Sequence, residues 1–301
     1  MKPRRFSVFA WVVLAYNVLV ILWGAYVRIS FSGDGCGANW PFCNGQMIPR
    51  QMSLPTVIEY THRMMTSLDS FLVITMCIWA FLVFPKRHAA RSYSLISLVF
   101  LLIEALLGAG LVLFRYVTTD QSAGRAWYLS AHLTNTMLLL AAITATAWVA
   151  RNGVERLKLS GLTRRAVWAL AITVFVSITG AVTALGDTLF PASSIGAGMR
   201  QDFSSASSVL LRLRVIHPLI AVAGAAYLLW LASKSLAHAR GSGIGRAAAA
   251  VAGITILQLA AGMVNLTLLA PVWMQITHLA VADILWIAVV ILALETREIE
   301  I

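Results

Sequence analysis

The sequence is short of charge: only 12% of its 301 residues are charged, whereas 59% are hydrophobic and the mean hydropathy is +0.82. A soluble domain of this size rarely reaches that mean hydropathy. The apolar runs also lack the alternating pattern of a transmembrane β-barrel. The first run has no small-residue cleavage site and is too long for a removable signal peptide. These absences point to a helical membrane protein.

Long apolar runs are what the sequence has instead. A helix needs about 20 apolar residues to cross a hydrocarbon layer of about 30 Å. Runs of this length lie at about residues 8–28, 64–84, 94–114, 128–150, 166–185, 211–232, 248–269 and 273–294. Helices satisfy their own backbone hydrogen bonds in lipid. We therefore expect an all-α integral membrane protein with eight transmembrane helices.

The basic residues outnumber the acidic ones and give a net charge of +11. This excess alone would suit nucleic-acid binding, but it is segregated along the chain. All the lysines lie in the N-terminal segment or in alternate predicted loops: Lys2, Lys86, Lys158 and Lys234. Basic residues concentrate on the cytoplasmic side of membrane proteins. The pattern predicts a multi-pass protein of the cell membrane with both termini in the cytoplasm and no nucleic-acid partner.

Histidines recur at similar places in the two halves of the chain. Each of the following lies within the first turn or two of an even-numbered predicted helix: His62, His132, His217 and His278. Even-numbered helices run from outside to inside, so these imidazoles are expected near the outer face. Small residues recur at the outer ends of the odd-numbered helices. We expect two homologous four-helix bundles, residues 1–150 and 166–301, joined by a cytoplasmic linker at 151–165.

A polar side chain inside a membrane helix is costly and usually functional. For a single histidine, a hydrogen bond to a neighbouring helix is an equally good explanation. Two histidines per half at one depth suit the two axial ligands of one haem. The expected pairs are His62 with His132, and His217 with His278. Zinc is a poorer match because it needs three or four convergent ligands.

Arginines on the outer side are candidates for binding haem propionates, because guanidinium groups pair with carboxylates in bidentate geometry. The alternative for each is an interfacial side chain that reaches toward water. The candidates are Arg28, Arg63, Arg212 and Arg214.

The two halves differ in their acidic residues. Glu59 stands three residues before His62, whereas the corresponding positions hold Leu129, Arg214 and Gln275. A partly desolvated carboxylate there could accept a proton or stabilise a developing cation. It could also be an ordinary acid at a helix N-terminus. Two further acids lie deep in predicted helices, Asp69 and Glu104, where they serve either a proton path or a hydrogen bond between helices.

The first outer loop contains "SGDGCGANWPFCNG" at residues 32–45. The six residues between Cys36 and Cys43 match neither a CxxC redox motif nor a zinc knuckle. A disulfide suits the oxidising outer compartment. We favour a disulfide-closed loop above the first haem site over a catalytic thiol pair, and both interpretations remain open. A metal site is excluded because Asp34 is the only further acid or histidine in the loop.

The stretch "GAYVRISFSGDGCGANWPFCNG" at 24–45, followed by "IEYTHR" at 58–63, resembles the haem A synthase family. The four histidines and eight helices extend the resemblance over nearly the whole chain. One departure is visible: the third outer loop, 186–208, lacks the second cysteine pair of some bacterial relatives. A redox exchange between two cysteine pairs is therefore not expected.

The resemblance implies an oxidoreductase that converts the C8 methyl group of haem O to the formyl group of haem A for terminal oxidases. It implies that His217 and His278 are the axial ligands of haem b, and that His62 and His132 hold the substrate haem O. Glu59 matches the functionally critical glutamate of the family. The implied partners are haem O synthase, a farnesyltransferase, and an electron donor, in addition to membrane lipid.

The main alternative is a di-haem membrane cytochrome that only transfers electrons, since the histidines alone fit it equally well. Glu59 and the first-loop motif favour the enzyme. A second alternative is a transporter built on the repeat, which predicts matching broken helices at mid-membrane. Pro218 has no counterpart in the corresponding helix of the first half, and this disfavours transport.

Overall fold

The computed structural model describes residues 2–154, 156–158, 161–204, 209–239 and 241–300. Residues 155 and 159–160 of the predicted linker and 205–208 of the predicted third outer loop lie outside this description. Eight of its helices are long and apolar enough to cross a membrane. They are α1 (Lys2–Ile29), α2 (Leu54–Val83), α3 (Ala89–Leu113), α4 (Ala123–Asn152), α5 (Gly161–Leu189), α7 (Val209–His238), α8 (Gly243–Thr267) and α9 (Val272–Glu295). The predicted all-α membrane fold is confirmed.

Several helices begin earlier than the apolar runs predicted. The helix α2 starts at Leu54, where the Ser53 hydroxyl accepts a hydrogen bond from the Thr56 backbone N–H. The helix α4 starts at Ala123, where the Ser122 hydroxyl accepts from the Arg125 N–H. Serine at this position satisfies a backbone donor that the helix leaves free. The polar first turns escaped the hydropathy reading, so His62 and His132 lie more than one turn deeper in their helices than predicted, whereas α7 and α9 begin within two residues of the predicted starts.

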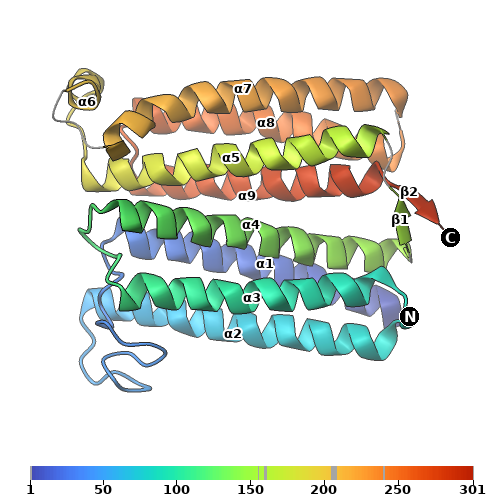
Figure 1. Cartoon of the computed structure of the whole chain (residues 1–301), viewed down its shortest axis with the longest axis horizontal. Helices are drawn as coiled ribbons and strands as arrows, with labels where there is room; N and C mark the ends of the chain where they lie inside the picture. Colours follow the sequence, from blue (N-terminus) through green and yellow to red (C-terminus); the bar gives the residue numbers. More distant parts are fainter. Residues whose placement is uncertain (1, 155, 159–160, 205–208, 240, 301) are drawn as a thin grey trace.

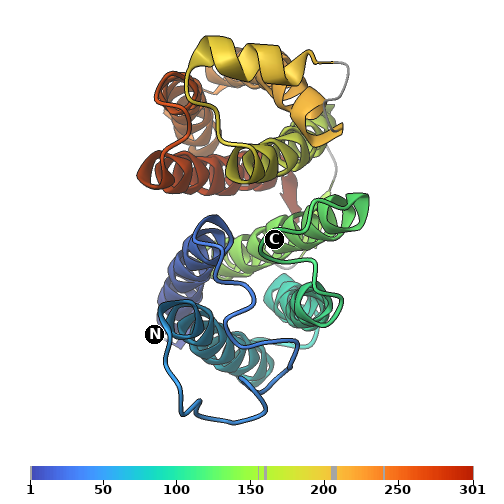
Figure 2. The ribbon, with the colours of Figure 1, turned by 90° about the vertical axis from the view of Figure 1, so that its left-hand side faces the viewer.

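The long helices form two four-helix units that lie one above the other (Figure 2). The first unit contains α1–α4, and its core includes Phe6, Met76 and Ile143. The second contains α5, α7, α8 and α9, and its core includes Leu231 and Leu292. The predicted boundaries of the two halves and their homology both stay predictions.

The two units meet through α1 and α4 on one side and α5 and α9 on the other. In the interior of this interface the Trp286 indole N–H donates to the Met137 carbonyl at 2.7 Å. Nearer the ends of α4 and α9 the Trp148 indole donates to Glu295 at 2.9 Å. Because each indole finds an acceptor on the opposite unit, the interface fixes the relative register of the two units.

The two ends of the molecule differ (Figure 1). One end carries the segments 30–53 and 114–122 and a short helix, α6 (Ile195–Asp202), which the sequence did not predict. The other end carries both termini. There β1 (Arg156–Lys158) pairs antiparallel with β2 (Glu298–Glu300), which joins the linker to the C-terminal segment. The helices α2, α4, α7 and α9 all begin at the loop end, so their histidines lie toward that end.

Candidate functional site

Each of the four helix histidines faces a glycine on the neighbouring helix. The pairs are Gly24 with His62, Gly108 with His132, Gly180 with His217, and Gly262 with His278. A β-carbon added to these glycines would lie 3.0, 3.8, 3.0 and 3.1 Å, in that order, from the ring Cε1 atom. Three of these distances are too short for an ordinary contact, so glycine is what lets the ring lie against the neighbouring backbone. The sequence showed the small residues but not this one-to-one pairing.

The four histidines are divided between the two units. His62 and His132 belong to the first unit, on α2 and α4, and His217 and His278 belong to the second, on α7 and α9. All four rings are half-buried. Within the part of the chain that the structure describes, no group of three or more His, Cys, Asp or Glu side chains is arranged to hold a metal ion. Each unit thus has two half-buried histidines on its even-numbered predicted helices, and their pairing at one site stays a prediction.

The ring nitrogens of the histidines have different surroundings. The Nδ1 atom of His217 lies 2.9 Å from the Thr179 hydroxyl, and that of His132 lies 3.3 Å from a carboxylate oxygen of Glu104. The approach of Glu104 to His132 is within ion-pair distance but lacks hydrogen-bond geometry. The buried Nδ1 atoms of His62, His132 and His278 therefore have no hydrogen-bond partner among the described residues. An unpartnered buried nitrogen is costly, which is a sign of a site that another group completes.

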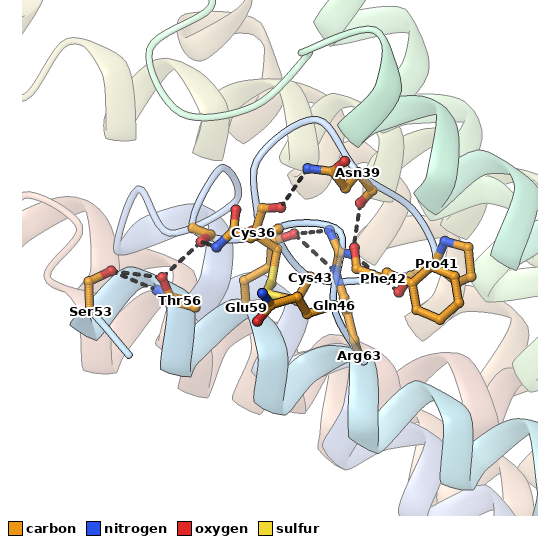
Figure 3. The surroundings of a disulfide bond; sticks show 12 residues. Cys36, Asn39, Pro41, Phe42, Cys43, Gln46, Ser53, Thr56, Glu59 and Arg63 are labelled. Carbon is orange, nitrogen blue, oxygen red and sulfur yellow. Dashed lines mark hydrogen bonds and ion pairs between the residues drawn. A yellow bond between two sulfur atoms is a disulfide. The ribbon is translucent and has the colours of Figure 1, made fainter. Parts of the chain in front are cut away.

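Glu59 is buried on α2, one turn before His62, and only 3% of its surface is exposed. One carboxylate oxygen accepts a 2.7 Å hydrogen bond from the Cys36 backbone N–H. The other accepts from the Arg63 guanidinium at 3.1 and 2.5 Å (Figure 3). The acid is thus charge-paired and tied to the first outer loop, a connection that its spacing from His62 did not reveal.

Cys36 and Cys43 are joined by a disulfide and are both buried. The loop between them is fastened to α2 from two sides (Figure 3). The Thr56 hydroxyl donates to the Gly35 carbonyl at 2.8 Å. The Arg63 guanidinium donates to the carbonyls of Asn39 and Phe42, each at 2.8 Å. The loop is therefore a cross-linked cover on the N-terminal turns of α2.

The predicted propionate-binding arginines have protein partners. Arg28 donates to the Ala184 carbonyl and the Thr188 hydroxyl, both at 2.7 Å, and so bridges the two units. Arg214 pairs with Asp187 at 3.2 Å and with Asp202 at 2.5 Å.

Arg63 and Arg212 complete the predicted set. Arg63 holds Glu59 and the loop, and Arg212 is exposed and also has an interaction partner. A propionate would have to share these groups or use others. Arg115 is one such group, since it lines a cavity of about 510 Å³ together with Asp34 and Asp120.

The deep acids Asp69 and Glu104 both form hydrogen bonds between helices. Asp69 accepts from the Asn17 amide on α1 at 2.7 Å. Glu104 on α3 accepts from the Asn135 amide on α4 at 2.5 Å and also from the Thr136 hydroxyl. The sequence singled out both acids, but the contact of Glu104 with His132 was missed, because it depends on how α3 and α4 pack.

Comparisons with known proteins give the family. The family model COX15-CtaA, described as cytochrome oxidase assembly protein, matches residues 7–290. Proteins named protoheme IX farnesyltransferase from two strains of Thermus thermophilus are 44% identical over 297 residues, 98% of this chain. The chain spans about half of these relatives, 49% of their length. A heme A synthase from Exiguobacterium sibiricum is 36% identical over 112 residues, 37% of this chain and 38% of that protein. The chain belongs to the COX15-CtaA family of cytochrome oxidase assembly proteins.

Proposed function

We propose that this protein is a haem A synthase, an oxidoreductase that converts the C8 methyl group of haem O to a formyl group. One observation carries the proposal: of the two histidine pairs, only the pair in the first unit has a buried carboxylate, Glu59, one turn away. Family membership and the likeness to proteins named heme A synthase support it. The first unit is then the substrate site and the second holds haem b.

The residues fit a haem in each unit. Haem iron takes axial imidazoles, and a ligating imidazole is oriented through its other nitrogen. Thr179 offers such a contact to His217, and a carboxylate oxygen of Glu104 lies 3.3 Å from Nδ1 of His132. In this assignment His62 and His132 hold haem O, while His217 and His278 hold haem b. When bound, haem b would supply a redox-active iron. The roles described next are those of the protein's own side chains.

Glu59 has a role that its contacts define. Both of its oxygens already accept hydrogen bonds, from the Cys36 N–H and from Arg63. Because both oxygens are occupied by the Cys36 N–H and by Arg63, these contacts favour an electrostatic role for Glu59 over proton transfer. Glu59 therefore stabilises positive charge that develops near His62, and at the same time it holds the disulfide loop over the site.

The orientation and the partners belong to the same proposal. The lysine pattern places both termini in the cytoplasm and the histidine sites toward the outer face. The proteins named protoheme IX farnesyltransferase contain a segment like this chain in about half of their length. This supports a partnership with haem O synthase, the enzyme that adds the farnesyl group, which would deliver haem O within the membrane. An electron donor completes the proposed set of partners.

The second candidate function is a di-haem cytochrome that transfers electrons without changing a haem. The likeness of the two histidine–glycine arrangements favours it, because both units look equally built for bis-histidine ligation. The two functions differ in one product, haem A.

Expression of the protein in cells that make haem O but not haem A distinguishes these functions. We expect the pigments extracted from cells with the wild-type chain to contain haem A. The control variant Asp34→Asn, which changes an exposed acid in the disulfide loop, should give the same result. We expect Glu59→Gln to abolish haem A while the haem b spectrum remains. Cells without haem A, despite a protein that carries both haems, would show that the chain is a cytochrome.

A further inference from the structure

Glu104 is locked against one turn of α4. One of its carboxylate oxygens accepts from the Asn135 amide at 2.5 Å, and the other accepts from the Thr136 hydroxyl. That second oxygen also lies 3.3 Å from Nδ1 of His132. Asn135 and Thr136 are largely buried, so the carboxylate has little freedom to leave this position. The acid is thus held in place beside the imidazole by two side chains of the same helix.

The second unit has a different side chain at the corresponding place. Glu104 stands four residues before Gly108, and Gln258 stands four residues before Gly262. Each of these glycines faces the histidine on the last helix of its unit, His132 or His278. The Gln258 amide nitrogen lies 3.4 Å from Nε2 of His278, whereas Glu104 approaches Nδ1 of His132. A carboxylate in the first unit is therefore replaced by an amide in the second.

This exchange matters to a histidine that ligates iron. A carboxylate only accepts hydrogen bonds, whereas an amide both donates and accepts and carries no charge. An acceptor on the second ring nitrogen fixes the orientation of the imidazole and raises its basicity as a ligand. Such hydrogen bonds are among the means by which a protein sets the reduction potential of haem iron. A more basic ligand favours ferric iron and so lowers the potential.

We propose that Glu104 is a positioning residue that acts through His132, and that the Glu104–Gln258 difference gives the two haem sites different reduction potentials. The inference rests on the proposed function, since it requires a haem in each unit. The first site, with the carboxylate, has the lower potential of the pair for a given haem. Glu104 on α3 lies beside His132, and it is distinct from Glu59, which lies on α2 one turn before His62.

The test uses the purified full-length chain loaded with haem b as the probe at both sites. Reduction is followed by spectroelectrochemical titration, and His217→Ala identifies the signal of the second site. We expect Glu104→Gln to raise the midpoint potential of the first site only and to weaken haem binding there by about 10–100-fold. We expect Gln258→Glu to lower the potential of the second site only. This reciprocal variant keeps the test decisive if Glu104→Gln fails to fold.

A matched control is Asp69→Asn, which changes another buried acid whose hydrogen bond joins two helices through Asn17 and not through a histidine. If Glu104 served only to join helices, both variants would lower thermal stability and neither would move a potential. Unchanged potentials in Glu104→Gln or Gln258→Glu, with both haems bound, would overturn the inference and leave the proposed function intact. A wild-type chain that binds no haem in the first unit would instead refute the proposed function.

Discussion

Replacing a glycine that faces a histidine with alanine should weaken haem binding. The effect should be larger where the added β-carbon lies closer to the histidine ring. A β-carbon at Gly180 would lie 3.0 Å from the His217 ring, whereas ordinary contacts are 3.4–4 Å. The ring must therefore move by a few tenths of an ångström. Overpacking of this kind costs about 1–3 kcal/mol. Alanine in a helix is favoured over glycine by about 0.5–1 kcal/mol, which offsets part of the cost.

The net penalty for Gly180→Ala is then about 0.5–2 kcal/mol, or about 2–30-fold in haem affinity. Gly108→Ala should have a smaller effect, since its added β-carbon would lie 3.8 Å from the His132 ring. Gly253→Ala is the matched control, because nothing lies within 4 Å of its added carbon. The assay is titration of the purified protein with haem b, together with a thermal melt. Equal affinity for the Gly180→Ala and Gly253→Ala variants would refute the argument that the ring needs the glycine.

Three further predictions concern the loop and the interface. The double variant Cys36→Ser, Cys43→Ser should lose about 2–3 kcal/mol of loop stabilisation and be cleaved faster by protease within residues 30–53. An unchanged cleavage rate would mean that the contacts to α2 are enough to hold the loop. Arg63→Lys, which cannot reproduce the bidentate fork, should speed the same cleavage, and resistance equal to wild type would contradict the assigned contacts. Trp286→Phe removes the hydrogen bond to Met137 and should lower the free energy of unfolding by about 1 kcal/mol. Trp168→Phe, a change at an exposed tryptophan, should have no measurable effect. Equal melting temperatures of the two variants would argue against the bond between the units.

The long helices were predictable because hydrophobic length is a property of the chain alone. All eight were expected, and all eight are present in the described part of the structure. Their starts were less predictable. Capping by Ser53 and Ser122 adds polar turns that hydropathy does not register. The short helix α6 and the pairing of β1 with β2 escaped prediction because they depend on local turns and on contacts between distant segments.

The candidate site was predictable in its residue types and less so in its contacts. Repetition in the sequence identified the four histidines, and the spacing from His62 identified Glu59. The hydrogen bond from the Cys36 N–H to Glu59 crosses 23 residues of sequence, and no periodicity reveals it. The partners of Arg28 are more distant still, since Ala184 belongs to the other unit. Arginines that looked suited to propionates are thus engaged by the protein, because tertiary packing brings acids and carbonyls to them.

The most direct test of the proposed function is the identity of the pigments that the purified protein carries. The chain is purified from cells that make haem O, and its pigments are extracted and identified by mass spectrometry. The proposal predicts haem b together with haem A or a partly oxidised haem O. It also predicts that Glu59→Gln carries haem b with unaltered haem O. Haem b as the sole pigment of both proteins would contradict the proposal that this chain oxidises haem O.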